Sequence, residues 1–238
     1  MARSKAINNS PEMPAAMASV SVGLTDDTGG AEVAPMAQLL GTGILPDSEI
    51  ARLIRDKGMI EGASLEHVGS GVVSYGLSSG GYDFRLSPIL RPFFASYGGA
   101  PVDPKDRTTS EAALEAPMTH TMYRGKRVFV MQPGMMALGS TVEKFSIPDD
   151  VIAITLGKST YARCGILLNV TPAEPGWSGY LTIEITNLNT VPVILYPYEG
   201  IGQMLFFRFA SRPNVTYSDR SGKYNNQSSG PVTATVRQ

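Results

Sequence analysis

The stretch that decides the fold is GKSTYARCGILLNVTPAEPGWSGYLTIEITN, residues 157–187. From residue 181 to residue 186, apolar and polar side chains alternate in the order Leu-Thr-Ile-Glu-Ile-Thr. This two-residue period is typical of a β-strand with one apolar face. The carboxylate of that strand, Glu184, therefore lies on the polar face, between Thr182 and Thr186.

Glu184 has two interpretations. On an open sheet face it is an ordinary solvated side chain, as most glutamates are. A functional role is favoured by a glycine-rich turn before the strand, residues 174–179, and by two cations and three hydroxyls within residues 157–163. The chain also offers few other conventional catalytic groups. We therefore treat this strand as the candidate location of the catalytic residue.

The composition indicates one β-rich globular domain with tails. The chain has 238 residues, 42% of them apolar, and its 25 glycines and 17 prolines separate many short apolar segments. Short apolar runs divided by frequent turns are typical of all-β proteins. The net charge of −1 supplies no basic excess for a phosphate backbone or an anionic membrane surface. We expect neither nucleic acid nor membrane as a partner.

Cysteine and histidine are too scarce for several common kinds of site. Cys164 is the single cysteine, which excludes an internal disulfide, and the two histidines, His67 and His120, show no ligand spacing. A His/Cys/Cys zinc site of the kind used by most nucleobase deaminases cannot be assembled from them. A Ser-His-Asp triad is poorly supported. We expect Cys164 to be a small buried residue rather than a nucleophile.

The two ends of the chain are expected to lie outside the folded domain, residues 44–212. Residues 1–43 are rich in Ala, Met, Ser, Pro and Gly and have no stable period, which predicts a disordered tail. They lack a signal-peptide pattern, and no run of 18 apolar residues exists, so we expect a cytoplasmic protein. Residues 213–238 are expected to form a flexible arm. It is either disordered or ordered by an anion, because its cations are mixed with hydrogen-bond donors.

Three further segments are assigned from local patterns. Residues 45–58 predict a short amphipathic helix. Residues 82–86 alternate as a strand in which Asp83 and Arg85 share a face and can pair. Residues 97–126 are polar and predict a long loop or excursion.

Five separated motifs resemble those of one known family. They occur in the same order as in the dCTP deaminases of the trimeric dUTPase-like superfamily, from about residue 45 to residue 230. The motifs are SYGLSSGGYDFRL (74–86), VDP (102–104), the stretch 157–187 quoted above, EGIGQMLFF (199–207) and YSDRSGKY (217–224).

The resemblance implies a mainly β fold. It is a distorted β-barrel or jelly-roll of the dUTPase-like type with one or two short helices, assembled as a homotrimer with active sites between subunits. It also implies zinc-independent hydrolytic deamination of dCTP to dUTP and ammonia, which feeds dUMP and dTTP synthesis. Glu184 resembles the general acid/base that activates water against C4 of cytosine. Ser159 and Arg163 resemble the groups that orient this water and stabilise the reacting base.

The resemblance further implies residues that bind the substrate. Lys158, Ser159 and Thr160 resemble phosphate contacts, Thr182, Ile183 and Glu184 line the nucleoside pocket, Gln203 belongs to the nucleotide pocket, and Tyr217, Lys223 and Gln227 lie on the arm that closes over the triphosphate. The family uses Mg²⁺ bound through the triphosphate oxygens, as expected of an ion that dehydrates reluctantly. No protein residue is expected to ligate a metal.

The residues themselves agree with this chemistry. One positioned carboxylate can take a proton from water and deliver it to N3 and to the leaving ammonia. Burial should raise the pKa of Glu184, and Arg163 would oppose that shift.

Two alternatives remain at this point. One is a bifunctional enzyme that continues to dUMP and pyrophosphate, or a plain dUTP pyrophosphatase. The other is a non-catalytic trimeric binding protein of the same fold. A pyrophosphatase of this superfamily normally carries an Asp base beside a base-stacking Tyr, so Glu184 favours deamination. The presence of Glu184, Ser159 and Arg163 together argues against a non-catalytic protein.

Overall fold

The computed structural model describes residues 43–93 and 101–234, which belong to one compact unit of the chain. The predicted disorder of residues 1–42 falls outside the described residues. Gly43, the last residue of the predicted tail, instead begins a strand that pairs with Arg208. No helix among the described residues is long and apolar enough to cross a membrane.

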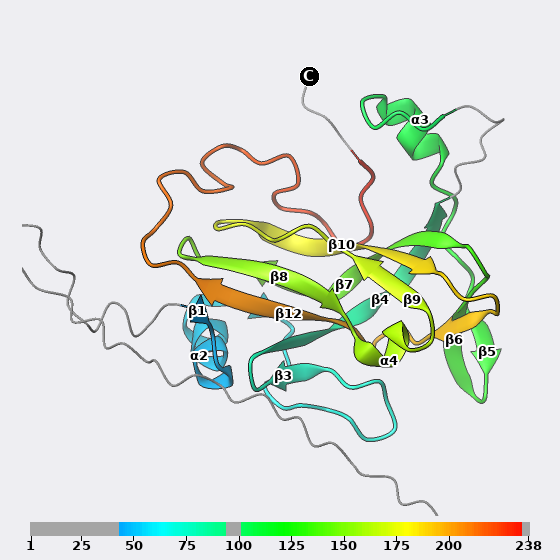
Figure 1. Ribbon diagram of the computed structural model, residues 1–238, viewed down its shortest axis with the longest axis horizontal. Helices are drawn as coiled ribbons and strands as arrows, with labels where there is room; N and C mark the ends of the chain where they lie inside the picture. Colours follow the sequence, from blue (N-terminus) through cyan, green and yellow to red (C-terminus); the bar gives the residue numbers. More distant parts are fainter. Residues whose placement is uncertain (1–42, 94–100, 235–238) are drawn as a thin grey trace, which may run out of the picture. The chain divides into compact units, whose positions relative to one another are not determined.

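The described residues form twelve strands and three short helices (Figure 1). The strands are β1 (Gly43–Ile44), β2 (Ile60–Glu61), β3 (Gly76–Ser78), β4 (Gly81–Phe93), β5 (Thr121–Tyr123), β6 (Lys126–Met131), β7 (Met136–Ser146), β8 (Val151–Gly157), β9 (Ile166–Asn169), β10 (Ser178–Asn187), β11 (Val193–Leu195) and β12 (Gly200–Arg208). The helices are α2 (Asp47–Lys57), α3 (Arg107–Ala112) and α4 (Ser159–Ala162).

The strands form two antiparallel sheets. The larger one has the order β1-β12-β4-β7-β10-β9, with β2 added on β7, β3 on β4 and β8 on β12. The smaller one has the order β11-β6-β5. The larger sheet is curled, and β12 within it pairs with β8 along one edge and with β4 along the other. The predicted mainly β, distorted-barrel fold is confirmed.

Large aromatic side chains from three strands fill the core. Phe84 on β4 and Phe145 on β7 meet edge to face, with ring centroids 6.4 Å apart, and Phe206 on β12 is also fully buried. Burying side chains of this size stabilises the fold by about 1.5–3 kcal/mol each. Gly202 on β12 makes this packing feasible, because a Cβ there would lie 2.4 Å from the Phe84 ring.

The predicted helix at residues 45–58 is confirmed as α2, which buries Ile50 and Leu53 against the sheet. It ends at Gly58, whose φ of +62° is the left-handed conformation that glycine adopts without strain. The segment 97–126, expected as a loop, contains α3 and β5 in its described part.

Two local predictions are wrong. Asp83 and Arg85 do not pair with each other, because each side chain meets a partner distant in sequence, Lys158 between β8 and α4 for Asp83 and Glu143 on β7 for Arg85. Arg85 Nε lies 2.7 Å from Glu143 Oε1, and Lys158 Nζ lies 2.5 Å from Asp83 Oδ2. Cys164 is exposed rather than buried, because it follows α4 on the surface.

Candidate active site

Strand β10 carries Glu184 and lies between β7 and the edge strand β9 of the larger sheet. Glu184 pairs in register with Leu138 of β7 and with Asn169 of β9. The alternation predicted from the sequence is observed, since Ile183 and Ile185 are fully buried while Thr182 and Glu184 are partly buried on the other face.

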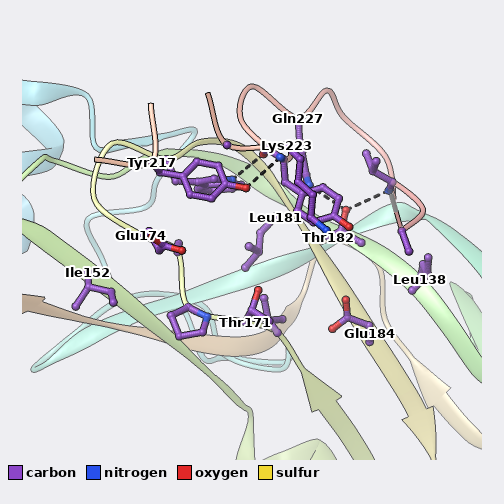
Figure 2. Close-up of a pocket in the computed structure, with 18 of the residues that line it drawn as sticks. Leu138, Ile152, Thr171, Glu174, Leu181, Thr182, Glu184, Tyr217, Lys223 and Gln227 are labelled. Carbon is purple, nitrogen blue, oxygen red and sulfur yellow. Dashed lines mark hydrogen bonds between the residues drawn. The ribbon is translucent and has the colours of Figure 1, made fainter. Parts of the chain in front are cut away.

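The polar face of β10 forms one side of a cavity of about 920 Å³. Figure 2 shows Thr182 and Glu184 on the strand, and Tyr217, Lys223 and Gln227 contributed by the C-terminal arm, here residues 213–234. Cavities of about 300–1,000 Å³ with a few convergent polar groups are the usual binding sites for small molecules. The structure therefore brings these five predicted residues together.

Burial raises the pKa of Glu184. The Asn169 side chain opposes this shift in part, because its amide nitrogen donates a hydrogen bond to Glu184 Oε2 at 3.4 Å. A carboxyl group with a raised pKa binds and releases protons closer to neutral pH, which suits a general acid/base. Arg163, expected to oppose the shift, does not contribute within the protomer.

A β-bulge shapes the side of the cavity that β10 forms. The register between β10 and β7 shifts between Tyr180 and Thr182, so Leu181 and Thr182 both line the cavity. Ile183 was expected to bind substrate, but its side chain is fully buried in the core. Strand alternation points it away from the cavity, so any contact of Ile183 with a nucleotide is limited to its backbone.

The arm is hydrogen-bonded directly to β10. The Thr182 hydroxyl donates to Gln227 Oε1 at 3.2 Å and accepts from the Val232 N–H at 3.1 Å. The Tyr180 N–H donates to the Gln227 carbonyl at 3.1 Å. Gly179 makes this approach possible, because its φ is +141° and a Cβ would lie 2.6 Å from the Gln227 nitrogen.

A second group of contacts holds the arm on the turn before β10. The indole N–H of Trp177 donates to the Tyr224 carbonyl at 2.8 Å, and the Tyr224 N–H donates to the Tyr217 hydroxyl at 3.0 Å. Arg220 on the arm forms an ion pair with Glu174 in the turn. The arm thus borders the cavity and is held both on β10 and on the turn before it.

The remaining predicted residues lie elsewhere in the protomer. Ser159, Thr160 and Arg163 are exposed on or beside α4, which follows β8 and does not line the cavity (Figure 1). Lys158 is paired with Asp83, as noted above. Figure 1 shows α4 at the end of β8, away from the arm.

Gln203 also lies outside the cavity. It is on β12, where its side-chain amide donates to the Ser78 hydroxyl at 3.1 Å. The Gln203 amide therefore has a hydrogen-bond partner within the protomer.

Sequence reasoning missed several residues that the structure brings to the site. Asn169 meets Glu184 only through the pairing of β9 with β10. Leu138 reaches the cavity from β7 in the same way. The turn residues Glu174 and Trp177 were visible as a motif, but their partners on the arm were not. The opposite charges of Glu174 and Arg220 were the one sequence signal that could have predicted a contact between the turn and the arm.

No group of three or more His, Cys, Asp or Glu side chains within residues 43–93 and 101–234 is arranged to hold a metal ion. The two carboxylates that line the cavity are Glu174, which is paired with Arg220, and Glu184.

Comparison with known proteins gives one consistent result. A family model described as dCTP deaminase-like matches residues 44–209. The chain is 45% identical to a dCTP deaminase of Erythrobacter litoralis over 184 residues, 77% of this chain and 95% of the relative. It is 44% identical to a dCTP deaminase of Campylobacter curvus over 185 residues, 78% of this chain and 94% of that relative.

A solved structure supports the fold. The crystal structure of 2'-deoxycytidine 5'-triphosphate deaminase from Agrobacterium tumefaciens aligns with a TM-score of 0.53 and 18% identity, over 71% of this chain and 49% of that one. At this identity the likeness concerns the fold alone. The family match covers most of the described domain, including β10, and the chain therefore belongs to the dCTP deaminase-like family.

Proposed function

We propose that the protein deaminates dCTP to dUTP and ammonia by hydrolysis without zinc. The observation that carries the proposal is the partly buried Glu184 carboxylate, with its raised pKa, in a cavity enclosed by β10 and the arm. The relatives named dCTP deaminase, of which this chain covers about 95%, support the substrate.

The chemistry follows from the position of Glu184. Its carboxylate takes a proton from water, and the resulting hydroxide adds to C4 of cytosine. The protonated carboxyl gives this proton to N3. The carboxylate then takes the proton of the new C4 hydroxyl and delivers it to the amino group, which leaves as ammonia as the C4 carbonyl forms. Each transfer returns Glu184 to its starting state. A positioned acid/base of this kind contributes about 10²–10⁴ in rate.

We also propose that each site is shared between two protomers of a homotrimer. Ser159 and Arg163 are exposed at α4 and do not line the cavity of their own protomer. The site that they can complete is therefore that of a neighbouring copy. Exposed apolar side chains beside α4 support this contact. Ile154 and Leu156 on β8 are 38% and 48% exposed, and Leu167 on β9 is 51% exposed. Such a patch is typical of an interface.

Magnesium enters the proposal as a partner of the triphosphate. In this proposal the ion is held by phosphate oxygens and water, as suits an ion that dehydrates reluctantly. When bound, Mg²⁺ would neutralise part of the triphosphate charge. The protein's own contribution is the hydroxyl of Tyr217 and the ammonium group of Lys223, both of which line the cavity.

The identity of the products tests the activity. Purified protein is incubated with dCTP and Mg²⁺, and dUTP, dUMP, ammonia and pyrophosphate are quantified separately. Equimolar dUTP and ammonia are expected. Release of dUMP with pyrophosphate would identify the bifunctional alternative, and no turnover of dCTP would contradict the proposal.

Mixed trimers test the shared site. Glu184→Gln and Ser159→Ala protomers with different tags are co-expressed, and trimers carrying both tags are isolated. In a cyclic trimer every mixed assembly has one site built from the unaltered Glu184 and the unaltered Ser159, so about one third of wild-type turnover should return. If each protomer supplies its own Ser159, no activity returns.

A further inference from the structure

Helix α4 is too short to hold its own position. It has 4 residues, whereas an isolated helix below about 12–15 residues is marginal in water. It nevertheless presents Ser159 and Arg163, the side chains proposed to complete a neighbouring site. Their placement therefore depends on contacts between α4 and the rest of the domain.

One of these contacts is a buried ion pair at the start of the helix. Lys158 precedes α4, and its carbonyl accepts hydrogen bonds from the N–H groups of Tyr161 and Ala162, both at 3.0 Å. Its ammonium nitrogen lies 2.5 Å from Asp83 Oδ2, and the two side chains are 10% and 6% exposed. The residue that begins the helix is thus bound to Asp83.

Asp83 is fixed in the interior of the larger sheet. It lies on β4, where it pairs in register with Gly76 of β3 and Gln203 of β12. His67 Nε2 approaches the same carboxylate oxygen at 3.5 Å. Because strands flank Asp83 on both sides, it is a rigid reference for the position of Lys158.

A second contact holds the inner face of α4. Tyr161 is buried, and its hydroxyl accepts a hydrogen bond from the Tyr196 N–H at 3.0 Å. Tyr161 fixes the helix against the core, and the Asp83–Lys158 pair fixes its first turn. Ser159 lies between these two contacts in the sequence.

We propose that Asp83 is a positioning residue for the deamination reaction. Through Lys158 it holds α4 where Ser159 and Arg163 reach the substrate at Glu184 of a neighbouring protomer. This inference rests on the proposed function and on the shared site. It also reassigns Lys158, which serves as the link between Asp83 and α4 rather than as a phosphate contact.

The burial of the pair argues for this reassignment. To contact a phosphate, Lys158 would have to leave the buried side chain of Asp83. A buried carboxylate without its partner is costly, whereas replacing both members of a buried pair by neutral side chains is often tolerated. Removing both charges is therefore the informative change, and either single change risks unfolding.

The test variant is the double substitution Asp83→Asn/Lys158→Met. We expect it to fold and form trimers, with kcat reduced about 100-fold, since a misplacement of about 1 Å can cost this much in rate. The KM for dCTP should change much less, because the cavity and the arm of the binding protomer are intact. A large rise in KM with kcat preserved would instead make Lys158 a phosphate contact and overturn the proposal.

A matched control removes the other buried ion pair on β4. Arg85→Met/Glu143→Gln deletes a pair of the same kind that does not contact α4. Its kcat should stay near the wild-type value even if its melting temperature falls. An equal loss of kcat in this control would mean that the effect is general disruption of the core, which would overturn the specific role of Asp83.

Mixed trimers then identify which half of the site is damaged. The double variant mixed with Glu184→Gln should regain about one third of wild-type turnover, because one site combines the first protomer's Glu184 with an undisturbed α4. Mixed with Ser159→Ala, it should regain none, since every α4 is then either displaced or lacks its serine. The opposite pattern would overturn the proposal.

The mixture of Glu184→Gln and Ser159→Ala protomers, run in parallel, tests the shared site separately from the positioning role of Asp83. If that mixture fails to regain activity, the shared site is wrong and the proposal falls with it. If that mixture succeeds while the double variant retains wild-type kcat, the shared site stands and Asp83 has no positioning role.

Discussion

The strand β10 and the helix α4 carry the two parts of the proposed catalytic set in contrasting surroundings. Glu184 on β10 is partly buried, hydrogen-bonded to Asn169 and enclosed by the arm of its own chain. Ser159 and Arg163 at α4 are exposed and lie outside that cavity. The protomer therefore completes the environment of the acid/base but leaves the groups that assist it facing outward.

This contrast supports the proposed division of labour between copies of the chain. In that proposal one protomer binds the nucleotide and moves the protons, and its neighbour supplies fixed donors near the reacting base. Donors that are held in place before the reaction cost no reorganisation when charge develops. The rigidity of α4 then matters as much as the pKa of Glu184.

The largest expected effect is at Glu184. Glu184→Gln removes the group that transfers protons while keeping the side-chain shape, so deamination should fall by about 10²–10⁴ or more. Ammonia release measures the loss, and size-exclusion chromatography checks the assembly. Glu61→Gln, at an exposed carboxylate on β2, is the control and should be active. Near-normal turnover by Glu184→Gln would show that Glu184 is not the acid/base of the reaction.

A second prediction separates two neighbours on α4. Ser159→Ala should lower kcat by about 10²–10³, the usual cost of losing a donor to a developing charge. Thr160→Ala, one residue along, removes only a proposed phosphate contact and should raise KM with kcat largely kept. Steady-state kinetics with dCTP distinguish the two. Equal losses of kcat at both positions would mean that the substitutions disturb the structure of α4 and that Ser159 has no specific catalytic role.

A third prediction concerns pH. Glu184 must be ionised in the free enzyme to accept a proton, so kcat/KM should fall about tenfold per pH unit below its pKa. Burial raises that pKa, and the Asn169 hydrogen bond lowers it. Asn169→Ala should therefore move the acid limb of the kcat/KM profile to higher pH, with little change on the alkaline side. A limb that moves to lower pH would contradict this assignment.

The smallest effect is expected at the N-terminus. Deletion of residues 1–42 keeps Gly43, which pairs with Arg208, and should leave kcat and KM for dCTP within about twofold of wild type. The same assay with the full chain is the reference. A collapse of activity would make this segment part of the catalytic unit.

The strand, its turn and Glu184 could be predicted because their signals are local. Alternation with a period of two fixes which face of β10 is polar, and the turn residues at 174–179 mark where the strand begins. The helix α2 was equally visible from its periodicity and from Gly58. The strand and its turn account for the part of the site that lies on β10.

The pairing of side chains distant in sequence could not be predicted. Asp83 was expected to pair with Arg85, two residues away, but its partner is Lys158, 75 residues along the chain. The contact between Asn169 and Glu184 likewise depends on strand pairing. Local patterns give the face on which a side chain lies but not what the sheet places opposite it.

Trp177 gives the protein a built-in optical reporter. It is the only tryptophan in the chain, and its indole N–H is bonded to the Tyr224 carbonyl of the arm. Any ligand that lifts or tightens the arm must change this bond and the polarity around the ring. Stopped-flow fluorescence of the unlabelled enzyme can therefore follow nucleotide entry and product release in real time.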